Sequence, residues 1–257
     1  MVMKLATWNV NSLKVRLPQV IDWLIENKPD VLCLQEIKVI DENFPMDEIM
    51  TAGYEPVFIG QKTYNGVAIL SKQKASNVTT AIPGLADEQK RVIAATYGDL
   101  RVICAYVPNG DHVESEKYEY KLRWLPAFTQ WLQQELMDHK KLAVLGDFNI
   151  APEDRDVYDA ELWSGKVLCS EPERTAFRNI LNLGLTDSFR LFEQPEKSYT
   201  WWDYRMMAFR RNQGLRIDHI LLSDELSNAC VTCMVDKTMR KLERPSDHAP
   251  VWVELSA

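Results

Sequence analysis

Five short segments place acids, amides or histidine next to apolar runs. They read Trp8-Asn9-Val10-Asn11, Leu34-Gln35-Glu36, Gly146-Asp147-Phe148-Asn149, Arg216-Ile217-Asp218-His219 and Ser246-Asp247-His248-Ala249-Pro250. One such segment would be typical of a solvated loop, but five of this composition predict a shared site. Residues two apart in extended chain point the same way, as Asp147 and Asn149 would. Packed sheets bring strand ends to one rim, where we expect Asn9, Glu36, Asp147, Asn149, Asp218, Asp247 and His248.

The acids of this rim predict a metal site. With His248 neutral, the four carboxylates of Glu36, Asp147, Asp218 and Asp247 sum to a charge of −4. Such a cluster repels itself and any anionic substrate, and a hard divalent cation would relieve both repulsions. Carboxylate and amide oxygens suit Mg²⁺ or Mn²⁺, whereas Zn²⁺ favours more His or Cys. A metal beside an Asp and a His can polarise a phosphoryl oxygen and activate water, which predicts hydrolysis of a phosphodiester or phosphomonoester.

Many short strands and few helices must position these residues. Strand patterns cover Lys4–Val10, Asp30–Gln35, Gly66–Leu70, Val92–Tyr97, Arg101–Val107, Leu142–Leu145, Arg216–Leu222, Ala229–Val235 and Pro250–Leu255. Helical patterns cover Leu17–Asn27, Glu114–His139 and Glu173–Leu183, and Pro126 should kink or split the second. Tyr97–Leu100 resembles a hairpin turn. We expect a four-layered α/β sandwich, with two mixed β-sheets packed face to face and helices on the outside.

Composition limits the class of protein. The 257 residues are 46% hydrophobic and 26% charged, without a linker or repeat, which predicts a single globular domain over residues 1–257. The net charge of −7 disfavours nucleic-acid binding through the overall field but leaves room for a local basic groove. No long apolar run follows Lys4, so we expect a cytoplasmic protein without a membrane partner. The scattered cysteines fit reduced thiols, and Cys230 with Cys233 lacks two further zinc ligands.

Five motifs carry a resemblance to a known family. Trp-Asn-Val-Asn, Leu-Gln-Glu-x-Lys, Gly-Asp-Phe-Asn, Arg-Ile-Asp-His-Ile and Ser-Asp-His-Ala-Pro occur in the order seen in the exonuclease III family of apurinic/apyrimidinic (AP) endonucleases, and the resemblance runs from Lys4 to Glu254. It implies a monomeric DNA-repair nuclease that uses Mg²⁺, with Mn²⁺ able to substitute. Its substrate would be duplex DNA, cut 5′ to abasic sites, trimmed at blocked 3′ ends and degraded from 3′ to 5′. The alternatives are a phosphatase or phosphodiesterase of the same superfamily acting on another phosphate ester, and a non-catalytic DNA-binding module.

The resemblance also implies roles for the rim residues. Glu36 resembles the principal metal ligand, with Asn9 and Asp247 beside it and with Asp147 and Asn149 at the metal as well. Asp147 would orient or deprotonate the attacking water, and Asn149 would position that water and the phosphate. The scissile phosphate would contact His248 and Tyr106. Asp218 would hold His248 in one tautomer.

Further positions resemble the family's DNA contacts. Trp201, Leu215 and Ile217 match an apolar pocket for an extruded abasic sugar, with plain core packing as the alternative. Basic and amide positions that match the DNA path are Lys38, Arg91, Asn109, Arg205, Arg210, Arg211 and Arg216. His219 alternates away from Asp218, so we interpret it as structural.

Overall fold

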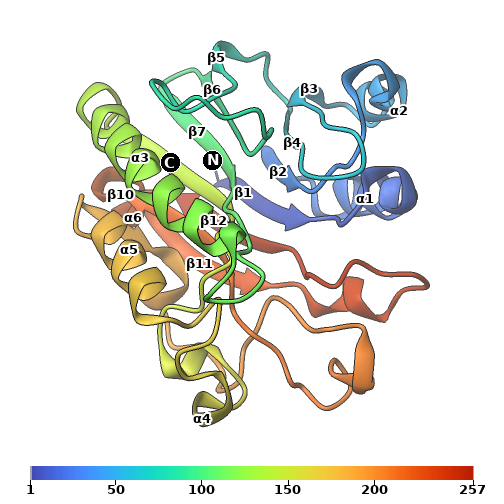
Figure 1. Cartoon of the computed structure of the whole chain (residues 1–257). Coiled ribbons are helices and arrows are strands. Elements are labelled where there is room, and N and C mark those ends of the chain that lie inside the picture. Colours follow the sequence, from blue (N-terminus) through green and yellow to red (C-terminus); the bar gives the residue numbers. More distant parts are fainter. Residues whose placement is uncertain (1, 257) are drawn as a thin grey trace.

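Strands that bury apolar side chains on both faces build two mixed sheets of six strands each. The computed structural model describes residues 2–256, and Figure 1 shows the arrangement. The first sheet has the order β11 (Cys230–Val235), β12 (Val251–Ser256), β1 (Val2–Asn9), β2 (Val31–Gln35), β4 (Val67–Ser71) and β3 (Glu55–Ile59). The second has the order β5 (Ser76–Thr79), β6 (Val92–Tyr97), β7 (Leu100–Tyr106), β8 (Lys141–Asp147), β10 (Asp218–Ser223) and β9 (Leu185–Asp187).

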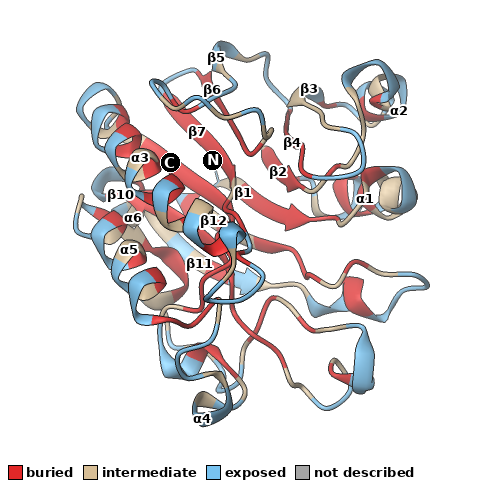
Figure 2. Ribbon diagram, viewed as in Figure 1, coloured by how far each residue is buried: buried red, intermediate tan, exposed pale blue. Residues whose placement is uncertain are grey.

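The alternation along each strand explains the four layers. In β1, Leu5 belongs to the core between the sheets, whereas Ala6 belongs to the core under the helices; in β2, Cys33 and Leu34 divide in the same way. Because both faces of the inner strands are buried, these strands are almost continuously apolar. The helices α1 (Leu13–Asn27) and α2 (Met46–Thr51) cover the first sheet, and α3 (Glu116–Asp138) and α5 (Glu171–Leu181) cover the second (Figure 2). The expected sandwich is confirmed.

Some elements differ from the sequence expectation. The apolar pattern does not reveal the edge strands β3, β5 and β9, because β3 contains Pro56 and is only half-buried, β5 is largely exposed, and β9 has three residues. It also misses α2 and the short helices α4 (Ala160–Trp163) and α6 (Asp224–Ala229). Pro126 lies inside α3 and does not split it, since burial of one helix face against the sheet supports the helix on both sides. In residues 2–256 no helix is long and apolar enough to cross a bilayer.

Arg216, expected to contact DNA, lies in the interior instead, and this corrects the expectation. Its guanidinium is 1% exposed and pairs with Asp156 at 2.7 Å and Asp187 at 2.8 Å, because a buried charge requires partners. Arg216 also donates to Nδ1 of His219 at 3.0 Å, and Nε2 of His219 donates to the carbonyl of Ile150 at 2.9 Å. This pattern requires the neutral imidazole. Burial and the Arg216 charge lower the pKa of His219 to about 4.

The first prediction concerns the pH dependence of stability. Because the pKa of His219 falls from 6.5 when unfolded to about 4 when folded, the unfolded state binds more protons between these pH values, and the free energy of unfolding rises with pH there. His219→Gln keeps one acceptor and one donor but cannot titrate. We expect the wild type to lose about 3 kcal/mol more than this variant as pH falls through the window. Urea denaturation at stepped pH measures this, with the exposed His112→Gln as control; parallel wild-type and His219→Gln curves would contradict it.

Candidate active site

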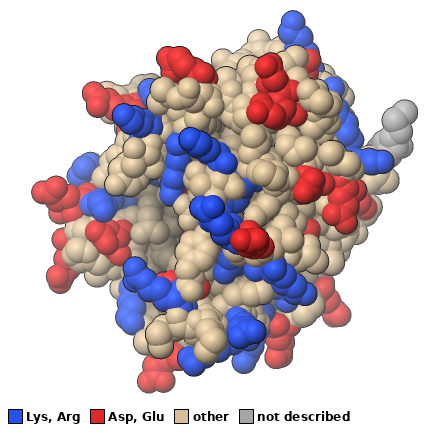
Figure 3. Space-filling view, turned by 90° about the vertical axis from the view of Figure 1, so that its right-hand side faces the viewer, with Lys and Arg blue, Asp and Glu red and all other residues tan. Residues whose placement is uncertain are grey.

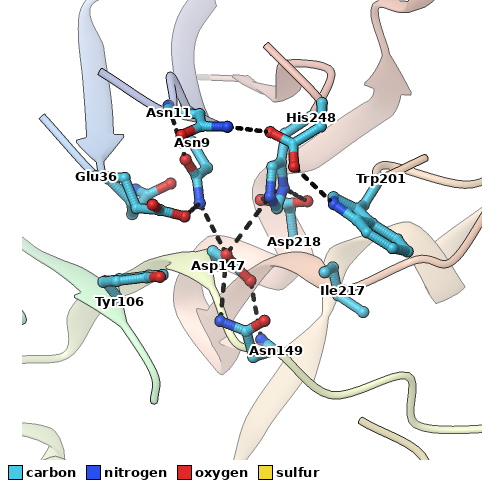
Figure 4. A network of polar contacts seen from close by, with 12 residues as sticks. Asn9, Asn11, Glu36, Tyr106, Asp147, Asn149, Trp201, Ile217, Asp218 and His248 are labelled. Carbon is cyan, nitrogen blue, oxygen red and sulfur yellow. Dashed lines mark hydrogen bonds and ion pairs between the residues drawn. The ribbon is translucent and has the colours of Figure 1, made fainter. Parts of the chain in front are cut away.

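The strand ends that carry the polar residues meet at one edge of the sandwich (Figure 4). Asn9 ends β1, and Glu36 directly follows β2, which runs parallel to β1. Tyr106 and Asp147 end the parallel strands β7 and β8 as register partners. Asp218 begins the antiparallel strand β10 directly opposite Asp147. Strand direction therefore delivers these residues to the same edge from both sheets.

The side-chain amide of Asn9 links the two sheets at this edge. Its Nδ2 donates to Oε1 of Glu36 at 2.8 Å and to Oδ2 of Asp147 at 2.9 Å. Its Oδ1 accepts the backbone N–H of Asn11 at 3.0 Å, which settles the orientation of the amide. Asn9 is fully buried. A donor thus lies between the two carboxylates and offsets part of their mutual repulsion.

His248 lies between two aspartates of the second sheet. Its Nδ1 is 2.9 Å and 3.1 Å from the two oxygens of Asp218, and its Nε2 is 3.7 Å from Oδ2 of Asp147. Although burial opposes a charge, Asp218 and Asp147 raise the pKa of His248. Burial raises the pKa of Asp147, with Asp218 and Glu36 adding to this effect and the His248 charge opposing it. The imidazole is therefore held as a cation in one orientation.

Two carboxylates beside His248 could hold a metal ion. Within the described residues, potential ligand atoms of Glu36, Asp147 and His248 all lie within 4.8 Å of one another. Because the imidazolium has no free nitrogen for a metal, the carboxylates of Glu36 and Asp147 would be the ligands, and such hard oxygen donors fit Mg²⁺ or Mn²⁺ better than a thiol-seeking metal. The residues present therefore fit the cation that the sequence predicts.

Asp247, predicted as a metal ligand, lies outside this group. Its Oδ1 accepts from Nδ2 of Asn11 at 3.0 Å, and its Oδ2 accepts from Nε1 of Trp201 at 3.0 Å. Burial would raise its pKa, but the charge of His248 and these two donors hold the pKa of Asp247 below its usual value. Asp247 thus connects Asn11 to Trp201. Asn11 was not among the predicted site residues, although its position two residues after Asn9 was a usable signal.

Asn149 is held on every side by the protein. Its backbone N–H donates to Oδ1 of Asp147, and its Nδ2 donates to the carbonyl of Val107, both at 2.9 Å. Its Oδ1 accepts from Nδ2 of Asn109, also at 2.9 Å. These bonds fix Asn149 against Asp147 and place the side chain of Asn109, a predicted DNA contact, beside it.

Arg91 supports Tyr106 at the margin of the site. The guanidinium lies 4.8 Å from the ring centroid of Tyr106 and donates to its carbonyl at 3.2 Å. Burial and the carboxylates of Glu36 and Asp147 raise the pKa of the Tyr106 phenol, so it remains a donor. Arg91 and Tyr106 also line an open pocket of about 580 Å³ with Asn109. Arg91 is nearly buried, so only the part facing this pocket can reach DNA.

The remaining expected DNA contacts differ in exposure. Arg205, Arg210 and Arg211 are exposed, and within residues 2–256 no carboxylate lies within 4.0 Å of their guanidinium nitrogens. Figure 3 shows Lys and Arg gathered across the middle and lower part of one face, with most Asp and Glu nearer its margin. Lys38 lies at the rim, 2.8 Å from Glu36.

The expected apolar pocket beneath Trp201 is filled in this structure. Leu215 and Ile217 are 0% and 1% exposed and pack into one cluster with Leu168 and Cys169, against which Trp201 lies. The core-packing alternative therefore describes Leu215 and Ile217, and only Trp201 remains partly accessible.

Comparisons with known proteins agree with this geometry. Residues 6–248 match the Endonuclease/Exonuclease/phosphatase family. The chain is 38% identical to exodeoxyribonuclease III of Haemophilus influenzae, over 98% of this chain and 99% of the relative. A 3′ phosphatase from Neisseria bound to a product DNA hairpin has a TM-score of 0.98 at 50% identity, covering 99% of this chain and 100% of that one. An AP endonuclease from Archaeoglobus fulgidus has a TM-score of 0.95 at 39% identity, with the same coverage.

The second prediction tests the Asn9 bridge. Asn9→Asp replaces a donor by a third carboxylate between Glu36 and Asp147, so without metal the free energy of unfolding should fall by about 2 kcal/mol, the loss of a hydrogen bond to a charged group. Mg²⁺ should raise the melting temperature of the variant more than that of the wild type, because it relieves the added repulsion. Thermal unfolding in EDTA and in Mg²⁺ measures both effects. Asn228→Asp, on the exposed face of α6, is the matched control, and equal Mg²⁺ responses in all three proteins would contradict the prediction.

Proposed function

Since the chain belongs to the exonuclease III/AP endonuclease family, it is a hydrolytic DNA-repair nuclease, and we propose that it uses Mg²⁺ to hydrolyse phosphodiesters at 3′ ends and 5′ to abasic sites in duplex DNA. The observation that carries this proposal is the convergence of Glu36, Asp147 and His248 with the Asn9 amide between the carboxylates. All of these groups come from one chain, which supports action as a monomer.

Different residues have different roles in phosphodiester hydrolysis. Glu36, with Asn9 and Asp147 beside it, would hold the cation, which supplies charge stabilisation at a phosphoryl oxygen when bound. Asp147 accepts a proton from the attacking water, and Asn149 keeps that carboxylate in place through its backbone N–H. His248, held charged by Asp218, donates to a non-bridging phosphate oxygen, and the Tyr106 phenol donates to another.

The DNA duplex would lie across the basic face in Figure 3. Arg205, Arg210 and Arg211 have no carboxylate partner among the described residues, so they are free to neutralise phosphates. The related 3′ phosphatase from Neisseria is bound to a product DNA hairpin, which supports DNA as the substrate. A phosphatase for small phosphate esters would leave these arginines without a role and is not favoured.

The filled space beneath Trp201 bears on the preferred substrate. A 3′-terminal group reaches the rim without extrusion of a sugar, whereas an abasic sugar needs room that Leu215 and Ile217 leave closed in this structure. We therefore propose that 3′ ends are processed faster than internal abasic sites.

The third prediction tests activity and its metal requirement. In Mg²⁺ the protein should remove a 3′-phosphate from nicked duplex DNA and cut a duplex with one tetrahydrofuran abasic analogue more slowly, and EDTA should abolish both reactions. Asp147→Asn should lose about 10²–10⁴-fold in turnover, since it removes a positioned proton acceptor, while duplex binding persists. Gel-based cleavage and fluorescence anisotropy measure the two quantities. Asp138→Asn, exposed at the end of α3, is the control, and full cleavage in EDTA or by Asp147→Asn would rule out the mechanism.

The fourth prediction tests the DNA path. Arg210→Ala combined with Arg211→Ala should weaken binding to damaged and undamaged duplexes alike. The slope of log affinity against log salt should fall by about two, one for each phosphate contact removed. Arg123→Ala combined with Arg178→Ala removes the same charge from the outer helices α3 and α5 and should leave the slope unchanged. Equal slopes for the two double variants would place the DNA elsewhere.

A further inference from the structure

An ion pair is buried beneath the loops that carry the site residues. Lys121 of α3 and Glu173 of α5 are in direct contact, and both side chains have no exposed surface. Burying a charged pair in a core is often no more favourable than burying apolar residues of similar volume. A gain in stability therefore does not by itself explain why these two charges are buried. Their other hydrogen bonds indicate their role.

Besides its bond to Glu173, the Lys121 ammonium group donates hydrogen bonds to two loops of the site. Nζ donates to the carbonyl of Asn149 at 2.6 Å and to the carbonyl of Asn109 at 3.1 Å. An ammonium group has three N–H donors, so Glu173 and these two carbonyls satisfy all of them. On the other side of the loops, the side chains of Asn109 and Asn149 bond each other. The side chains of Asn109 and Asn149 thus link the two loops at the site, and Lys121 links the same two loops from the interior of the protein.

The backbone of Asn149 has an uncommon conformation. Its φ is +49°, in the left-handed region, which Asn adopts more readily than most residues but which still costs more than the right-handed region. From this conformation its N–H reaches Oδ1 of Asp147 at 2.9 Å. The carbonyl that Lys121 holds belongs to this same residue. Loss of that bond would free Asn149 to relax away from Asp147.

The other loop passes close to the Lys121 side chain. Gly110 follows Asn109 with φ +100°, and a Cβ there would lie 3.4 Å from Cδ of Lys121 and 2.9 Å from Cγ2 of Val167. A residue with a side chain would therefore be strained at this position and would press on Val167. Glycine thus allows the loop to run beside the lysine whose ammonium group holds the carbonyl of Asn109.

Glu173 keeps the ammonium group in place. Its Oε1 also accepts the backbone N–H of Leu168 at 3.0 Å, and its Oε2 accepts the N–H of Ser170 at 3.1 Å and the Ser170 hydroxyl. These bonds tie the carboxylate to the start of α5. The pair is consequently a fixed anchor shared by α3, α5 and both loops.

We propose that Lys121, anchored by Glu173, is a positioning residue for the nuclease reaction. By holding the carbonyls of Asn109 and Asn149, it determines where Asp147 and Asn149 stand relative to the metal and the scissile phosphate. This role rests on the proposed function. It predicts an effect on the chemical step, with little effect on DNA binding, because Lys121 has no exposed surface with which to touch DNA.

The test replaces the pair without leaving a buried charge unpaired. Lys121→Met with Glu173→Gln removes both bonds to the loop carbonyls and keeps an acceptor for Ser170. We expect kcat for 3′-phosphate removal to fall about 10–100-fold, the usual effect of removing a group that orients site residues, while KM and the duplex Kd stay within about twofold. Lys121→Gln combined with Glu173→Gln, which retains a shorter donor at position 121, should show a smaller loss of kcat and serves if the first double variant does not fold.

Two controls separate positioning from stability and from the proposed function. Leu132→Ala destabilises α3 through a core cavity three turns away and should leave kcat unchanged well below its melting temperature. Amide hydrogen exchange at Asn149 should accelerate in the Lys121 variants and not in Leu132→Ala, a readout that needs no activity. Unchanged kcat and exchange in the double variant, or equal losses in Leu132→Ala, would overturn the proposal. A wild-type protein that leaves DNA intact would instead overturn the proposed function, and the exchange result would still decide whether Lys121 holds the loop.

Discussion

The close approach of two carboxylates from different sheets is the constraint on which the rest of the site depends. Glu36 follows β2 and Asp147 ends β8, and the amide of Asn9 links them by donating to both carboxylates. An amide can do this only with its oxygen turned away, and the backbone of Asn11 holds it so. The packing of the sheets thus places negative charge at one edge, and a divalent cation is the natural counter-charge there.

Three other buried cations are compensated by residues distant in sequence. His248 carries its proton between Asp218 and Asp147, Arg216 lies between Asp156 and Asp187, and Lys121 pairs with Glu173. Arg216 is also hydrogen-bonded to His219, and Lys121 to two backbone carbonyls, as buried ions require. The result is a site whose side chains have little freedom before any ligand arrives, which favours catalysis by prearranged charges.

The net charge of −7 and a DNA substrate are compatible because charge is distributed unevenly. The arginines at 205, 210 and 211 are exposed, and Figure 3 shows a face on which Lys and Arg gather while most acids lie nearer its margin. Arg216 is close to them in sequence but faces inward, and Arg240 likewise lies 6% exposed against the rings of Trp202 and Phe209. The exposure of each arginine, rather than the number of basic residues in its segment, therefore decides which arginines can contact DNA phosphates.

The sequence by itself determined the layered sandwich, most strand positions and the rim residues Asn9, Glu36, Asp147, Asp218 and His248, because apolar periodicity marks the strands and polar motifs mark their ends. Only the tertiary structure decided that Arg216 and Leu215 are interior, that Asp247 bonds Asn11 and Trp201, and that Pro126 continues its helix. Lys121 lies on the apolar face of its helix, but the sequence does not show which residue pairs with its charge. Periodicity gives the direction of a side chain within its own element, whereas its burial and its partners depend on segments that only folding brings to it.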